Sequence, residues 1–143
     1  KTKGSKPIAV VFNLGINDMA NISNYISYMS DIASTLKSKN CKLFYMSVNP
    51  INSVMITKAG KGARTEAQVR EFNSKIRSGL SLNYKYIDTY SVLMKKGYGT
   101  NSSYSGTDAA SDDGLHYTTK TFKRIYYYCI TYLNTGSIDA SIY

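Results

Sequence analysis

Apolar residues along the chain follow two alternating spacings. Residues 8–14 (IAVVFNL) form a near-continuous apolar run after a polar stretch, which is typical of a strand buried on both faces of a parallel sheet. From Ile22 to Leu36 the apolar residues recur every three or four positions, which predicts an amphipathic helix. A strand followed by a helix is therefore the first predicted unit.

The same alternation continues through the rest of the chain. Residues 42–48 (KLFYMSV) predict a second strand, and residues 84–89 (YKYIDT) predict a third. Between them, Thr65 and Gln68 have the spacing of a capping box, which predicts the start of a second helix. Apolar positions over residues 122–133 predict a final helix. The predicted order is strand, helix, strand, helix, strand, helix.

This order predicts an α/β fold, a flavodoxin-like parallel sheet with helices on both faces in three layers. The sequence contains no internal repeat and no second domain, so residues 1–143 are interpreted as one domain. Its core spans about residues 8–134, between tails at 1–7 and 135–143. The long irregular segment 97–114 is interpreted as a loop. In such folds, functional side chains lie on loops at the carboxyl ends of the strands.

Positive charge dominates the chain, with 18 Lys and Arg against 9 Asp and Glu, a net charge of +9. This balance favours acidic surroundings. The basic residues are scattered, however, and no nucleic-acid motif is present, so we predict a solvated basic surface and no nucleic-acid partner. Residues 59–65 (AGKGART) resemble a phosphate-binding loop but lack its spacing, and are interpreted as a flexible basic loop.

The two cysteines, Cys41 and Cys129, are too few for a zinc site or a disulfide framework. A single bridge between them stays open, and no metal or cofactor is predicted. No apolar run approaches the roughly 20 residues of a membrane-spanning helix. The 14 tyrosines, with no tryptophan, favour an extracellular or cell-surface location on a bacterium over the cytoplasm.

Two short segments carry candidate chemistry, and both lie where this topology puts functional loops. The first, Gly15-Ile16-Asn17-Asp18, directly follows the first predicted strand. The second, at residues 113–116 (DGLH), precedes the last helix and contains the only histidine of the chain. An imidazole base needs an acceptor on one ring nitrogen to orient it. A carboxylate three residues earlier is close enough to do this in a tight turn.

In this order and on these elements, the two segments resemble the SGNH (GDSL-type) hydrolase family, in which a G-x-N-D block follows a core strand and a D-x-x-H block precedes the last helix. The resemblance implies roles for four residues. Asn17 is the expected donor to the oxyanion, and Gly15 is the small residue that lets its loop approach the substrate. His116 is the expected general base, and Asp113 is the residue that orients it. Asp18 is expected to cap the following helix.

The chain departs from the family at its nucleophile. The family's G-D-S block and the glycine of its second block are both absent, and no serine lies in a G-x-S-x-G elbow. Ser105 and Ser111 are loop serines and poor substitutes. We therefore expect a separate N-terminal segment of the same protein to supply both the nucleophilic serine and the first strands of the sheet. Without those strands, residues 8–14 would form an exposed apolar edge.

The expected function is hydrolysis of a carboxylic ester through an acyl-serine, with no cofactor. The family resemblance favours small acyl groups on carbohydrate, with lipid esters as the next alternative. A rival interpretation is a catalytically silent SGNH-like domain that docks on an anionic glycan or a partner chain. A flavodoxin-like nucleotide binder is also compatible with the element order, but no Gly-rich loop directly follows a strand.

Overall fold

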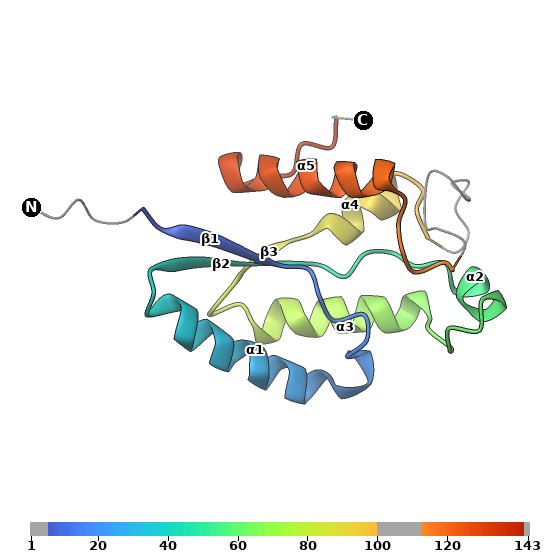
Figure 1. Cartoon of the computed structure of the whole chain (residues 1–143), viewed down its shortest axis with the longest axis horizontal. Coiled ribbons are helices and arrows are strands. Elements are labelled where there is room, and N and C mark those ends of the chain that lie inside the picture. The colour runs from blue at the N-terminus through green and yellow to red at the C-terminus, as the bar shows by residue number, and fades with distance from the viewer. Residues whose placement is uncertain (1–5, 100–112, 142–143) are drawn as a thin grey trace, which may run out of the picture.

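The computed structural model describes residues 6–99 and 113–141. Helices lie on both sides of a small sheet (Figure 1). In chain order the elements are β1 (Ile8–Phe12), the short 3-10 helix η1 (Met19–Asn21), α1 (Ile22–Lys37), β2 (Cys41–Met46), α2 (Ser53–Lys58), α3 (Glu66–Gly79), β3 (Lys85–Ile87), α4 (Thr89–Lys95) and α5 (Thr119–Thr135). The chain thus has the mixed α/β character predicted from its apolar pattern.

The sheet has three parallel strands in the order β1-β2-β3. In the register, Val10 of β1 lies opposite Leu43 of β2, and Tyr45 lies opposite Tyr86 of β3. Strands that run parallel bring their carboxyl ends to the same edge of the sheet. The loops that follow β1 and β2 therefore leave the sheet side by side.

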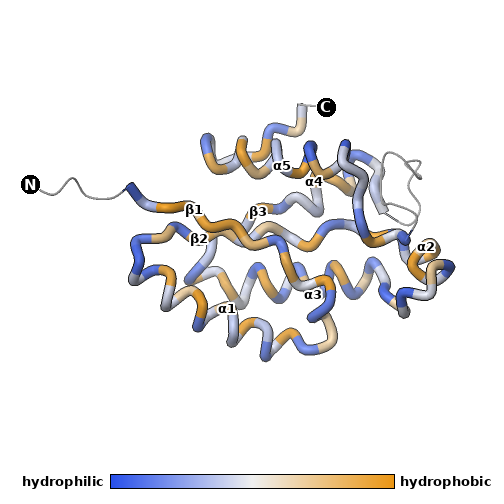
Figure 2. Tube along the Cα trace, in the orientation of Figure 1, coloured by the Kyte–Doolittle hydropathy of each residue, from blue (hydrophilic) through white to orange (hydrophobic). Residues whose placement is uncertain are grey.

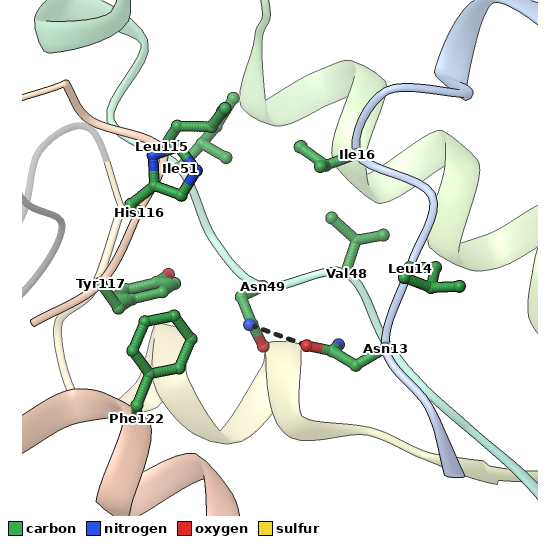
Figure 3. Close-up of a pocket in the computed structure, with 10 residues that line it drawn as sticks. All are labelled: Asn13, Leu14, Ile16, Val48, Asn49, Ile51, Leu115, His116, Tyr117 and Phe122. Atoms are coloured by element: carbon green, nitrogen blue, oxygen red, sulfur yellow. Dashed lines mark hydrogen bonds between the residues drawn. The ribbon is translucent and has the colours of Figure 1, made fainter. Parts of the chain in front are cut away.

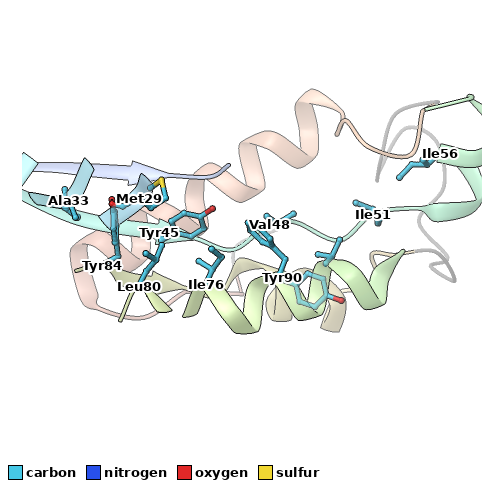
Figure 4. Packing of buried hydrophobic residues seen from close by; sticks show 13 residues of the cluster. Met29, Ala33, Tyr45, Val48, Ile51, Ile56, Ile76, Leu80, Tyr84 and Tyr90 are labelled. Atoms are coloured by element: carbon cyan, nitrogen blue, oxygen red, sulfur yellow. The ribbon is translucent and has the colours of Figure 1, made fainter. Parts of the chain in front are cut away.

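Strand β2 is central and buries side chains on both faces. Tyr45 packs in a cluster with residues of α1 and α3, whereas Phe44 and Met46 pack in a second cluster with α4 and α5. Successive strand residues point to opposite faces, so the alternation along β2 builds both cores. Figure 4 shows Tyr45 and Tyr84 among the buried residues of the first cluster. Coverage of both faces explains why the residues from Leu43 to Met46 are all apolar.

Two helices confirm the boundaries that the sequence predicts. Helix α1 spans Ile22–Lys37, and α3 begins after Thr65, with both bonds of the capping box formed. The Thr65 hydroxyl accepts from the Gln68 backbone N–H, and the Gln68 side chain accepts from the Thr65 N–H. The apolar stripe of α3, including Phe72 and Ile76, is buried. These helices form because periodic burial and capping favour the same register.

Two short helices were not predicted. Helix α2 lies within a segment without an apolar period, and α4 covers residues assigned in part to the third strand. Each begins at a residue whose side chain accepts a backbone N–H. Asn52 accepts from Met55, and Asp88 accepts from Ser91. Helices this short depend on capping and tertiary contacts rather than on hydrophobic periodicity.

The prediction that residues 8–14 form a strand buried on both faces is wrong for the residues that the structure describes. Strand β1 is shorter, pairs there with β2 alone, and has only exposed or half-buried side chains. Ile8 is 64% exposed, and Leu14 just beyond the strand is 57% exposed. Figure 2 shows hydrophobic colour along this edge strand. An apolar edge is instead the arrangement expected when neighbouring strands are missing.

The two cysteines are free, with Cys129 buried and Cys41 half-buried, so no bridge joins them here. Burial raises the pKa of the Cys129 thiol, which keeps it protonated at neutral pH. Among the described residues, no helix combines the length and apolar character that crossing a bilayer requires.

Candidate active site

A small pocket opens at the carboxyl ends of β1 and β2, and His116 lies in its wall (Figure 3). The pocket has a volume of about 90 Å³. It is lined by the residues drawn in Figure 3: Asn13, Leu14, Ile16, Val48, Asn49, Ile51, Leu115, His116, Tyr117 and Phe122. Segments from both predicted functional loops therefore meet at this edge of the sheet.

Asp113 and His116 are hydrogen-bonded, as their spacing predicts. Asp113 Oδ2 lies 2.6 Å from His116 Nδ1. The other carboxylate oxygen accepts from the backbone N–H groups of Leu115 and His116, both at 2.9 Å. The carboxylate is thus fixed by the turn that it closes, and 70% of the histidine side chain stays exposed. No described residue hydrogen-bonds His116 Nε2.

Gly114 docks this turn against the start of α2. Its φ angle is +73°, which favours glycine, and a Cβ there would lie 2.4 Å from the Asn52 carbonyl oxygen. The Asn52 N–H donates to the Gly114 carbonyl at 2.9 Å. The glycine of D-x-x-H is therefore required by close backbone packing, and through this contact the loop after β2 positions His116.

The loop after β2 is itself held by two side chains that were not predicted, the buried Asn73 and the half-buried Glu66. Asn73 of α3 accepts from the Val48 N–H at 2.8 Å and donates to the Val48 carbonyl at 2.9 Å. Glu66, in the first turn of α3, accepts from the Ile51 N–H at 2.6 Å. The only sequence signal for Glu66 was an acidic residue at a helix start. Asn73 carried no signal, because its buried partner is a backbone distant in sequence.

Two tyrosines complete this support. The Tyr90 hydroxyl donates to the second oxygen of Glu66 at 2.7 Å, and the Tyr117 hydroxyl donates to the Pro50 carbonyl. Burial, together with the hydrogen bond to Glu66, raises the pKa of Tyr90 to about 12. Burial raises the pKa of Tyr117 well above its ordinary value. Both are therefore neutral hydrogen-bond donors at physiological pH.

Gly15 begins the other functional loop, and its small size has a structural reason that the sequence did not indicate. It is buried with a φ of +110°, and a Cβ would lie 2.4 Å from the Phe72 ring. The Tyr45 hydroxyl donates to the Leu14 carbonyl at 2.7 Å. The core beneath the loop therefore demands glycine. Asp18, expected to cap the next helix, makes no side-chain capping bond, so that prediction is wrong.

Asn17 is exposed and lies at a second hollow rather than in the His116 pocket. Its side-chain oxygen accepts from Arg64 Nη2 at 3.2 Å. Because the oxygen is engaged, the amide Nδ2 remains as the donating group. Ile16 lines both hollows, so the loop that carries Asn17 borders the His116 pocket through its preceding residue.

A pair of amides in the pocket wall was also missed. Asn13 Nδ2 donates to the Ser47 carbonyl at 2.8 Å, and Asn49 Nδ2 donates to Asn13 Oδ1 at 3.5 Å (Figure 3). Both asparagines lie just beyond a parallel strand, and this position was the signal that could have identified them. They give the otherwise apolar pocket polar groups beside His116.

No family model, curated protein sequence or solved structure matches the chain. Its chemistry must therefore be inferred from the geometry. The pocket provides an oriented imidazole and fixed amide groups, which suit proton transfer to and from a small polar substrate. None of the described residues that line it is a serine, and Ser105 and Ser111 lie outside the described residues. Within residues 6–99 and 113–141, no three His, Cys, Asp or Glu side chains gather into a group suited to a metal ion.

Proposed function

We propose that this chain carries the acid-base part of an SGNH-like serine ester hydrolase. The observation that supports this most strongly is the 2.6 Å contact between Asp113 Oδ2 and His116 Nδ1, at a pocket where the carboxyl ends of two parallel strands meet. The contact fixes one ring nitrogen as the proton-bearing side. Nε2 is then the side that accepts a proton.

In the proposed reaction, His116 Nε2 takes the proton of a serine hydroxyl as the serine oxygen attacks the ester carbonyl. Asp113 stabilises the imidazolium that forms, without itself becoming protonated. The imidazolium then gives the proton to the leaving alcohol, and the acyl group stays on the serine. Water next attacks the acyl-serine, with His116 again accepting and returning a proton, and the carboxylic acid leaves.

The nucleophilic serine is proposed to come from a segment outside these 143 residues. The open edge of β1 supports this, because a further parallel strand added there would end at the same edge of the sheet as Asn13. A serine directly after such a strand would reach the pocket that His116 lines. The added strand would also cover Ile8, now 64% exposed.

Asn17 is proposed to donate from Nδ2 to the oxyanion of the tetrahedral intermediate. The bond that its oxygen accepts from Arg64 supports this role, because it leaves the amide N–H groups available. Because Asn17 lies at the second hollow, its loop must move toward the His116 pocket when substrate binds. Loops at binding sites commonly tighten in this way.

Pocket size supports a short acyl group. A cavity of about 150 Å³ holds benzene, and this one has about 90 Å³ with a wall that includes Leu14, Val48 and Leu115. It fits an acyl chain of about two to four carbons. We propose a small acyl ester as substrate, with a carbohydrate as the alcohol part.

The test is turnover of aryl esters by the protein that includes the proposed segment. Acetyl and butyryl esters should react at least about tenfold faster than the octanoyl ester, because the longer chain exceeds the pocket. His116→Ala should lower turnover by about 10³-fold or more, whereas Lys120→Ala, on the exposed start of α5, should leave it unchanged. Equal turnover by wild type and His116→Ala would refute the proposal.

A catalytically silent binding domain is the second candidate, and it is supported by the described lining of the pocket, to which residues 6–99 and 113–141 contribute no serine. It predicts no ester turnover under any condition. It also predicts that His116→Ala alters ligand affinity alone.

A further inference from the structure

A basic hollow lies beside the His116 pocket, on the other side of Ile16. It has a volume of about 240 Å³, and its lining includes Asn17, Lys61, Arg64 and Gln68. The pocket at His116 has a largely apolar lining, whereas the described residues that line this hollow include two cationic side chains and no carboxylate. The two hollows therefore suit different parts of one substrate.

The Arg64 side chain is held in place at this hollow. Its Nη1 donates to the Lys61 carbonyl at 2.7 Å, and its Nη2 donates to Asn17 Oδ1 at 3.2 Å. A guanidinium has five N–H donors in a rigid fork, so these two bonds orient the group without exhausting it. In the part of the chain that the structure describes, neither Arg64 nor Lys61 forms an ion pair with a carboxylate.

The next hollow along α3 provides an internal comparison. It is lined by Glu71 and Lys75, whose side chains form an ion pair at 2.6 Å. The lysine charge there is already balanced by a neighbour on the same helix. Among the described residues, the Arg64 hollow therefore lacks the carboxylate partner that the neighbouring hollow has.

We propose that the Arg64 hollow binds an anionic group, a carboxylate or a phosphate, carried by the alcohol part of the ester. This proposal rests on the proposed function for its placement. With the acyl group in the pocket beside His116, the alcohol part would extend past Ile16 into the second hollow. The planar guanidinium fork of Arg64 matches two oxygens of a carboxylate or phosphate, and Lys61 adds a point charge.

Arg64 would then act at two places. One nitrogen holds the amide oxygen of Asn17, while the free donors hold the anion. Binding of an anionic alcohol would therefore order the same amide that is proposed to meet the oxyanion. A neutral alcohol of equal size would lack this second contact.

The test measures equilibrium binding by amide NMR titration of the protein, so that it does not depend on turnover. Glucuronate supplies the carboxylate and glycerol phosphate supplies the phosphate, while glucose and glycerol are their neutral counterparts. At least one anionic probe should bind about tenfold or more tightly than its neutral counterpart, and should shift the amide resonance of Gly62. The probe that binds identifies the anion. Equal affinity for anionic and neutral probes, or no binding of either anion, would overturn the proposal.

Variants locate the site. Arg64→Ala should weaken anion binding about tenfold or more, Arg64→Lys should weaken it less, and the matched control Lys75→Ala should change it less than twofold. Arg64→Lys preserves the positive charge, so it tests the role of the guanidinium fork even if Arg64→Ala perturbs the loop. Equal effects of Arg64→Ala and Lys75→Ala would contradict the assignment. Anion binding without ester turnover would refute the proposed function alone, and turnover without anion binding would refute this site alone.

Discussion

Strands β1 and β2 have similarly apolar sequences and opposite surroundings. The four residues from Leu43 to Met46 in β2 are all buried, whereas no side chain of β1 is fully buried. Among the described strands, β2 has a partner on each side, and β1 pairs with β2 alone. An apolar sequence thus predicts that a strand can be buried. Whether it is buried depends on the elements that pack beside it.

The difference lies in how many neighbours each strand has. A central strand in a parallel sheet is covered by helices on its faces and by strands on its edges. Strand β1 has the sequence of such a strand, but its edge is open in the described structure. We therefore expect substitutions in β2 to cost stability under all conditions, and those in β1 to depend on what pairs with its open edge.

The largest loss of stability is expected from a substitution in β2, which is paired on both edges. Leu43 is 5% exposed, and Leu43→Ala should lower the free energy of unfolding by about 3 kcal/mol, because it removes buried methyl groups and leaves a cavity. Urea unfolding followed by circular dichroism measures this loss. A loss below about 1 kcal/mol would mean that β2 is not the core of the sheet.

A substitution in the loop after β1 should cost nearly as much. Gly15→Ala should lower the free energy of unfolding by about 2–4 kcal/mol, because it adds backbone strain to an overlap with the Phe72 ring. Gly62→Ala is the matched control. It also has a positive φ, +79°, but its Cβ would meet no atom within 4 Å, so about 1 kcal/mol is expected. Equal losses of stability in the two variants would show that packing against Phe72 is not why position 15 requires glycine.

Alkaline pH should weaken the contacts beneath both strands. Burial raises the pKa of Tyr84 to about 12, against 10 for the unfolded side chain, and its hydroxyl donates to the Met29 carbonyl. Its ring packs edge-on against Phe12 of β1 and Tyr45 of β2. The raised pKa means that the contribution of Tyr84 to stability is complete below pH 10 and is lost as pH rises to 12, by about 2 kcal/mol.

Unfolding free energies measured between pH 9 and 12 test this expectation. Tyr84→Phe should make the decline shallower, whereas Tyr28→Phe, at a side chain that is 66% exposed, should leave it unchanged. An identical pH dependence in wild type and Tyr84→Phe would contradict the assignment.

The smallest change in stability is expected at Ile8, and it tests whether another strand covers the edge of β1. Ile8 is 64% exposed at the open edge, so Ile8→Ala should change the free energy of unfolding by less than about 0.5 kcal/mol if β1 remains an edge. In the protein that includes the proposed strand, the same change should cost about 1–2 kcal/mol, because Ile8 is then covered. A small loss in that protein would mean that nothing packs on this edge.

Local patterns in the sequence were sufficient for the long elements. The stripe of α1, the capping box at Thr65 and the bond between Asp113 and His116 depend on residues close together in the chain, and the structure confirms all three. Helices α2 and α4 were not predicted, because they are short and depend on Asn52 and Asp88 as caps. Each spans too few residues for a repeated apolar period to develop.

The missed parts of the site depend on contacts between residues far apart in the chain. Glu66 reaches the Ile51 N–H, and Asn73 holds both backbone groups of Val48 across 25 positions. The family resemblance implied that Gly15 is small to let its loop approach the substrate. In the structure, the position that a Cβ would occupy is blocked by the Phe72 ring of α3. Such roles follow from how helices pack on the sheet, which spacing along one chain does not encode.

The most direct measurement is to label the protein that includes the proposed segment with a fluorophosphonate and to locate the labelled residue by mass spectrometry. The label should lie on a serine outside residues 1–143, and His116→Ala should slow labelling by about 10³-fold or more. Labelling of a serine within these residues, or labelling at the same rate in His116→Ala, would contradict the proposal that His116 activates a nucleophile brought to the edge of β1.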